Sequence, residues 1–144
     1  MIKVAKFGGS SVSEAAQFKK VKSIVEADPE RKFVVVSAAG KRFSEDNKIT
    51  DLLLLVNAHI RYGVDCSQLL LTIEERFQEI RDELGLSFDV HGEFEKLTSM
   101  ITKLSPDYIV SRGEWFTAQL MAEYLNMPFV DASTAIVFHH DGTI

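Results

Sequence analysis

The chain has 144 residues, of which 46% are hydrophobic and 26% are charged, and its net charge is −5. This length and balance suit one globular domain, and the acidic charge argues against a nucleic-acid partner, which would require clustered Lys and Arg. The longest apolar run, Leu52–Val56, is far shorter than the ~20 residues that cross a bilayer, and the one cysteine, Cys66, excludes an internal disulfide, so we expect a cytoplasmic protein without a membrane partner.

The first third of the chain has the pattern of a strand, a helix and a second strand. Met1–Phe7 is a short apolar stretch that ends at a pair of glycines, as strands often do. A helix is expected to begin at Ser13 and to stop before Pro29, with a buried face of apolar residues. Phe33–Val36 is apolar throughout, which is typical of a strand covered on both faces. A right-handed crossover would make the two strands parallel and place the helix on one face.

Helices dominate the middle of the chain. After the polar stretch Lys41–Lys48, which we expect to be mobile, Thr50-Asp51 is predicted to cap a helix through Ile60. Apolar stripes over Ile73–Leu84 and Phe94–Leu104 predict two helices that face each other or a common neighbour, with dimer contacts as the alternative. A further helix is expected over Ser111–Leu125.

The last part of the chain favours two more strands, at Phe129–Asp131 and Ile136–Phe138. The predicted fold class is therefore α/β, with a mainly parallel sheet flanked by helices. Three or four short strands make such a fold look unfinished, and we expect the chain to be a piece of a larger protein.

The strongest chemical signal is the glycine turn that follows the first strand. Gly8 and Gly9 let backbone N–H groups approach a ligand without a Cβ in the way, and the helix that follows aims its positive end at the same place. Such a site binds anions, most often phosphate, and Lys6 at the strand end could reach them. The alternative is a tight strand-to-helix turn with a solvent-facing lysine. Neither standard nucleotide fingerprint, G-x-x-x-x-G-K-[ST] or G-x-G-x-x-G, is present.

Four segments in the same order carry a family resemblance. Lys6–Val12 (KFGGSSV), Phe33–Gly40 (FVVVSAAG), Val110–Glu114 (VSRGE) and Phe129–Ala132 (FVDA) resemble the signatures of aspartate kinases, within the wider amino-acid kinase family. The resemblance implies a three-layer fold that is incomplete in this chain. It also implies that residues 1–144 are the amino-terminal, amino-acid-binding portion, with the nucleotide-binding half and regulatory ACT domains absent.

The resemblance also implies roles near the glycine turn. Lys6 would be the catalytic lysine that neutralises the transferring phosphoryl group. Gly8, Gly9 and Ser10 would line the phosphate path. Ser37 would hydrogen-bond the substrate or a phosphate oxygen, and its alternative is a turn hydroxyl bonded to its own backbone.

Three residues further along would bind the amino acid. Thr50 resembles the family's substrate-binding threonine, although the polar stretch before it makes that match less secure, and an N-cap is its other role. Glu114 would bind the α-ammonium of aspartate as a buried carboxylate near the start of a helix, and the alternative is a surface pair with Arg112. Arg112 ranks lower, since the family does not fix that position.

The implied reaction is transfer of a phosphoryl group from ATP to the side-chain carboxylate of L-aspartate. Magnesium would arrive with ATP, and the full-length protein would be a homo-oligomer. We expect no protein-built metal site, because adjacent His139 and His140 on a strand would point to opposite faces. The isolated segment is expected to be inactive.

Two other functions stay open. The first is another amino-acid kinase, acting on glutamate, acetylglutamate, carbamate or a nucleotide, although such relatives generally lack this combination of signatures. The second is a non-catalytic binding or assembly module whose glycine turn holds an anion.

Overall fold

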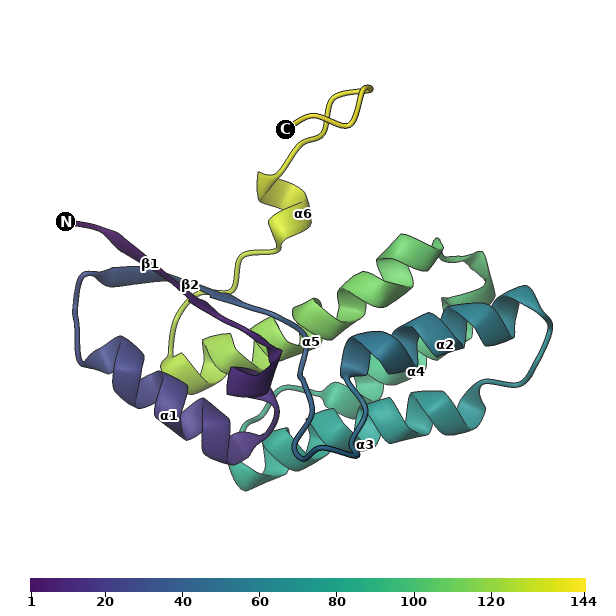
Figure 1. Ribbon diagram of the computed structural model, residues 1–144, viewed down its shortest axis with the longest axis horizontal. Coiled ribbons are helices and arrows are strands. Elements are labelled where there is room, and N and C mark those ends of the chain that lie inside the picture. Colours follow the sequence, from purple (N-terminus) through teal and green to yellow (C-terminus); the bar gives the residue numbers. More distant parts are fainter.

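The computed structural model describes residues 1–144 and is a mixed α/β structure in which a two-stranded sheet lies beside a group of helices (Figure 1). The elements in chain order are β1 (Lys3–Phe7), the 3₁₀ helix η1 (Gly9–Val12), α1 (Ala15–Glu26), β2 (Arg31–Val36), α2 (Ile49–Arg61), α3 (Ser67–Glu83), α4 (Val90–Met100), the 3₁₀ helix η2 (Ile101–Lys103), α5 (Pro106–Leu125) and α6 (Ala132–Ala135).

The sheet confirms the predicted strand–helix–strand unit. β1 and β2 are parallel, with Val4 opposite Phe33 and Lys6 opposite Val35. Because side chains alternate along a strand, these four residues share one face. That face is open: the exposed fractions are 67% for Val4, 59% for Phe33 and 48% for Val35.

The expectation that the second strand is covered on both faces is therefore wrong for these residues. α1 and α5 pack against β2, and no element of residues 1–144 covers the opposite face. Residues 1–144 therefore form only two layers of the predicted three-layer fold, the sheet and the helices on one of its faces. The apolar sequence of β2 is typical of a strand that is covered on both faces, but no element of these residues covers the second face.

The predicted stripes on α3 and α4 lie in the core, and they meet at a common neighbour. The rings of Phe77 and Phe94 have centroids 6.5 Å apart, and Phe116 of α5 stacks on them at 5.2 Å and 4.6 Å. Ile73, Phe77 and Phe94 are each at most 2% exposed, so they are too deeply buried for the alternative role in dimer contacts.

Two helix starts differ from the predictions. α5 begins at Pro106, five residues before Ser111, with the Ser105 hydroxyl accepting a hydrogen bond from the N–H of Tyr108. Proline at the first helical position favours a start rather than a break. α2 begins at Ile49, and Lys48 occupies the N-cap position, so Thr50 lies within the first turn and does not cap the helix.

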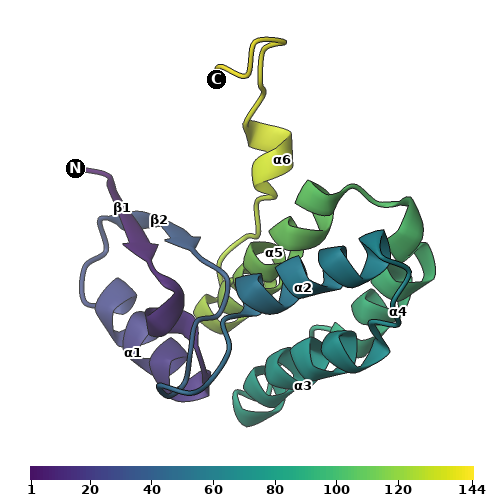
Figure 2. The same ribbon diagram turned by 45° about the vertical axis from the view of Figure 1, so that its right-hand side comes forward.

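The two carboxy-terminal strands do not form. Residues 127–131 are extended without ladder hydrogen bonds, and Ile136–Phe138 belongs to no strand. A strand requires hydrogen bonds to a paired neighbour, and neither segment forms such a ladder, although Phe129 and Val130 line hollows together with residues of β2. Asp131 instead caps α6, accepting from the N–H of Ser133 at 2.9 Å, and α6 leads away from the helices (Figure 2). None of the helices combines the length and apolar character needed to span a bilayer.

Candidate functional site

A cavity of about 560 Å³ lies where the turns after the two strands meet α2 and α5. Five predicted site residues line it, namely Gly9, Ser10, Ser37, Thr50 and Glu114. The other lining residues are Ala38, Ala39, Gly40, Lys41 and Lys48. The structure therefore gathers into one hollow residues that are more than a hundred positions apart in the sequence.

The first wall is the glycine turn. Gly8 has extended backbone geometry and its carbonyl accepts from the N–H of Ser11 at 3.0 Å. The N–H groups of Gly9 and Ser10 have no backbone acceptor, and both residues line the cavity. Their free donors make this wall suited to an anionic oxygen.

The helix after the turn differs from the prediction in its placement. The 3₁₀ turn η1 intervenes, and α1 begins at Ala15 with Glu14 at its N-cap. Glu14 and Ala15 line a separate, smaller hollow of about 110 Å³ rather than the cavity. The expectation that α1 aims its N–H groups at the glycine turn is therefore wrong, because η1 begins at Gly9 and α1 begins only at Ala15.

The second wall is the turn after β2 together with the start of α2. The N–H of Ser37 donates to the carbonyl of Phe7 at 3.1 Å, and the N–H of Ile49 donates to the carbonyl of Ala39 at 3.0 Å. These bonds hold the turn beside β1 and fix the first residue of α2. The N–H groups of Thr50 and Asp51 have no backbone acceptor, so the positive end of α2 lies at the cavity.

The third wall is α5, which approaches the second wall at a buried glycine. A Cβ on Gly113 would lie only 2.8 Å from the Cβ of Ala38, so the helix comes close because residue 113 has no side chain. Glu114 follows directly and lines the cavity. Its side chain is exposed and forms no ion pair, so the expectation of a buried carboxylate near a helix start is wrong in both respects.

Arg112 packs against aromatic rings and forms no ion pair with Glu114, so the alternative of a Glu114–Arg112 surface pair is wrong. Its guanidinium lies 4.0 Å from the ring centroid of Tyr108 and 5.2 Å from that of Trp115. Arg112 and Glu114 both line a neighbouring cavity of about 360 Å³ beside Asp131. Arg112 and the nearby Trp115 indole contribute to lowering the pKa of Asp131, for which the Ser133 hydrogen bonds are the larger cause.

Lys6 lies at the edge of the site rather than in its lining. Its side chain is exposed on the open face of the sheet, opposite Val35, and no hydrogen bond or ion pair holds it elsewhere. Phe7 and Gly8 alone separate it from Gly9 in the cavity wall. The ammonium is thus free to turn toward a ligand at the glycine turn.

Lys41 and Lys48 are cavity residues that the sequence reasoning missed. They stand at the two ends of the polar stretch 41–48, whose length was the only signal of them. Contrary to the expected mobility, this stretch is fixed to the protein: Asp46 is buried and accepts from the Arg42 side chain at 2.8 Å and 3.1 Å. The cavity therefore carries two ammonium groups and the carboxylate of Glu114, an arrangement that suits a ligand with charges of both signs.

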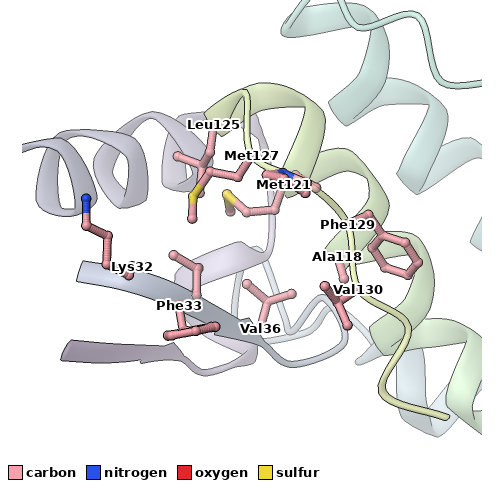
Figure 3. Close-up of a pocket in the computed structure, with 12 residues that line it drawn as sticks. Lys32, Phe33, Val36, Ala118, Met121, Leu125, Met127, Phe129 and Val130 are labelled. Carbon is pink, nitrogen blue, oxygen red and sulfur yellow. The ribbon is translucent and has the colours of Figure 1, made fainter. Parts of the chain in front are cut away.

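A fourth hollow, of about 140 Å³, is lined mainly by apolar side chains. Figure 3 shows its lining from β2, α5 and the following segment, including Phe33, Met121 and Val130. Ten of its 12 lining residues are hydrophobic, and Lys32 is its one charged residue. This hollow is therefore suited to packing against apolar side chains rather than to catalysis.

The fold is an α/β unit whose main cavity lies at the ends of its two parallel strands and is lined by polar and charged residues. The family model described as "Amino acid kinase family" matches residues 1–142. The chain therefore belongs to the amino acid kinase family.

The chain is also similar to proteins named as aspartokinases. The chain is 37% identical over 138 residues to "Aspartokinase 3" of Bacillus subtilis, covering 91% of this chain and 30% of that protein. It is 30% identical over 143 residues to "Aspartokinase 1, chloroplastic" of Arabidopsis thaliana, covering 85% of this chain and 23% of that protein.

Solved structures agree in fold. The aspartate kinase of Clostridium acetobutylicum superposes with a TM-score of 0.93 at 43% identity, covering 97% of this chain and 33% of that one. Aspartokinase III of Escherichia coli, solved in complex with aspartate and ADP, superposes with a TM-score of 0.69 at 27% identity, covering 88% and 29%. The chain thus spans about a third or less of these relatives.

Proposed function

We propose that this chain is the amino-acid-binding part of an aspartate kinase, which transfers the γ-phosphoryl group of ATP to the side-chain carboxylate of L-aspartate. The product is 4-phospho-L-aspartate, formed in the first step toward lysine, threonine and methionine. The observation that carries the proposal is the cavity, where the glycine turn, Ser37, Thr50 and Glu114 meet. The names of the relatives support the choice of substrate.

We further propose that residues 1–144 work as the amino-terminal portion of a longer kinase domain. The open face of the sheet and the unpaired edge of β2 are the surfaces that further strands and helices would cover. The apolar hollow of Figure 3 lies beside β2 and supports the same interpretation. The nucleotide-binding half and regulatory ACT domains would follow, and the full protein would be a cytoplasmic homo-oligomer.

The chemistry needs little beyond positioning and charge neutralisation. A carboxylate oxygen of aspartate attacks the γ-phosphorus, the bond to the bridging oxygen breaks, and ADP leaves with the bonding electrons. The nucleophile is already ionised near pH 7, so no strong general base is required. The Lys6 ammonium and the free N–H groups of Gly9 and Ser10 stabilise the charge on the phosphoryl oxygens. Gly8 would line the phosphate path through its backbone N–H, and Mg²⁺ enters with ATP.

The remaining lining groups would hold the amino acid. The Glu114 carboxylate pairs with the α-ammonium, and the Ser37 hydroxyl and Thr50 at the positive end of α2 bind carboxylate oxygens. Arg112 stands in the adjoining cavity and would act on the substrate only by leaving its aromatic neighbours.

A fusion protein tests the assignment. Residues 1–144 would replace the matching third of the Clostridium acetobutylicum enzyme, and aspartyl hydroxamate formed from ATP, aspartate and hydroxylamine would be measured. Glu114→Gln is expected to raise KM for aspartate about 10- to 100-fold, the loss of one charge-assisted hydrogen bond. Lys6→Met is expected to lower kcat by about 100-fold or more.

The matched controls are Asp107→Asn in the first turn of α5 and Lys20→Met on the exposed side of α1, which should leave both constants unchanged. Phosphorylation that persists undiminished in Lys6→Met would favour the non-catalytic module. Calorimetry of the fusion protein with aspartate and with glutamate distinguishes an aspartate kinase from a glutamate kinase. Tighter binding of glutamate would contradict our assignment. The isolated 144-residue chain should form no hydroxamate.

A further inference from the structure

A buried arginine on α3 connects the segments that form the cavity, although it does not line the cavity itself. The Arg76 side chain is 5% exposed. Its guanidinium donates to the carbonyls of Asn47 at 2.6 Å, Gly40 at 2.7 Å and Ser13 at 3.3 Å. Three backbone carbonyls, one from the segment between η1 and α1 and two from the loop that connects β2 to α2, thus converge on one side chain.

Each of those carbonyls belongs to a segment that carries cavity residues. Gly40 lines the cavity and precedes Lys41, and Asn47 precedes Lys48. Ser13 ends the glycine turn, and its hydroxyl donates to the carbonyl of Ser10 at 3.2 Å. Fixing these three carbonyls therefore fixes both lysines and the phosphate-facing turn relative to each other.

The carboxylate of Asp46 compensates the buried positive charge of Arg76. It is 9% exposed, lies 3.7 Å from the Arg76 guanidinium, and accepts from the backbone N–H of Arg42 at 3.0 Å. A buried cation without such a partner would be strongly unfavourable. A hydrophobic residue at position 76 would fill the space but leave the three carbonyls without donors.

We propose that Arg76 is a positioning residue, whose guanidinium holds the glycine turn and the loop between β2 and α2 in their ligand-binding arrangement around the cavity. Its role is separate from general stability, because its hydrogen bonds go to loop carbonyls and not to its neighbours in the α3–α4 core. The consequence for catalysis rests on the proposed kinase function, whereas the consequence for the loops does not.

The loop test uses amide hydrogen exchange of the 144-residue chain, followed by NMR. The N–H groups of Gly40 and Ile49 report on the turns, because they donate to Gly9 and Ala39. Arg76→Met should speed their exchange about 10-fold or more, since opening the loops becomes easier. The amides of Phe77 and Leu97 in the core should exchange as before.

Arg81→Met is the matched control. Arg81 lies on the same helix and donates to Asp82 alone, so its loss should leave Gly40 and Ile49 unchanged. Unchanged exchange at Gly40 and Ile49 in folded Arg76→Met would overturn the proposal. If Arg76→Met loses all protection, Arg76→Lys decides, because lysine keeps the charge but cannot bond three carbonyls in a fork.

For Arg76→Lys we expect exchange at Gly40 and Ile49 to rise about threefold or more, with Phe77 and Leu97 unaffected. A uniform rise at all four amides, or none, would overturn the proposal. In the fusion protein, Arg76→Lys should raise KM for aspartate more than about fivefold, while Arg81→Met does not. An inactive fusion would count against the kinase assignment and leave the exchange result standing.

Discussion

The N–H of Gly40 donates a 2.9 Å hydrogen bond to the carbonyl oxygen of Gly9, joining the turn after β2 to the turn after β1. A Cβ on Gly40 would lie 2.6 Å from the carbonyl carbon of Gly9 and 2.8 Å from the nitrogen of Ser10. Both contacts are to backbone atoms, which have no rotamer to relieve them. The two turns can meet, and the cavity wall can close, because residue 40 has no side chain.

Gly40→Ala should therefore separate the turns. We expect the free energy of unfolding to fall by about 1–3 kcal/mol, the usual cost of forcing a methyl group into a packed site. Urea unfolding followed by circular dichroism measures it. Gly8→Ala is the control, because a Cβ on Gly8 would have no atom within 4 Å and the φ of −75° at this position suits alanine. Equal losses in the two variants would show that the contact is unimportant.

Gly113→Ala tests the approach of α5 to the second wall. Alanine is better than glycine inside a helix by about 1 kcal/mol. Here we expect a net loss of stability, because the new Cβ would meet the Cβ of Ala38 at 2.8 Å. Adding Ala38→Gly should restore part of that loss, and a double-mutant cycle measures the coupling. Strictly additive effects would contradict a direct contact between the two residues.

Asp46→Asn should destabilise the protein at neutral pH, by about 3 kcal/mol, since it breaks a buried ion pair. The hydrogen bond from the Arg42 side chain is the main cause that lowers the pKa of Asp46 below its ordinary 3.8. A carboxyl group with a lowered folded pKa stabilises the protein fully above its unfolded pKa, and this contribution is lost as the pH falls.

The difference in unfolding free energy between wild type and Asp46→Asn should therefore be constant near pH 7 and shrink below about pH 4. Urea titrations at several pH values check this. Asp82→Asn is a comparison, because Asp82 pairs with Arg81 on the surface and should matter far less. A difference that grew on acidification would contradict the assignment.

His91 is expected to titrate above its ordinary pKa of 6.5, chiefly because its Nδ1 lies 2.5 Å from the Glu74 carboxylate, with Glu95 adding a smaller effect. A raised folded pKa stabilises the protein below the unfolded pKa, and the contribution disappears as pH rises through the folded value. NMR titration of His91 should show its pKa falling in Glu74→Gln. No fall would mean that the α3–α4 contact is not formed in solution.

The local elements near the amino terminus were predictable. The apolar run before Gly8-Gly9 and the valines of β2 predicted two parallel strands, and the stripes of α3 and α4 predicted buried helix faces. The conformational preferences of neighbouring residues and the periodicity of apolar positions determine such features. The prediction of two carboxy-terminal strands was wrong, because Phe129–Asp131 has strand-forming residues but forms no hydrogen-bonded ladder with another strand.

The candidate site was predicted in part. Gly9, Ser10, Ser37, Thr50 and Glu114 line one cavity, as their grouping required, whereas Lys6 and Arg112 stand beside it. The roles of all eight predicted residues, including Gly8, remain predictions for the experiments above. Lys41, Lys48 and Arg76 were missed, because a lysine or arginine in a polar stretch or helix has no local signature of what it faces.

The sequence by itself determined the two amino-terminal strands, the buried faces of α3 and α4, and the glycine turn after β1, because those properties depend on neighbouring residues. Only the tertiary structure decided that α5 brings Glu114 into the same cavity as the glycine turn, and that Arg76 bonds carbonyls in two separate loops at once. Those relationships depend on packing between residues distant in the chain, and packing is settled by shape and burial over the whole molecule.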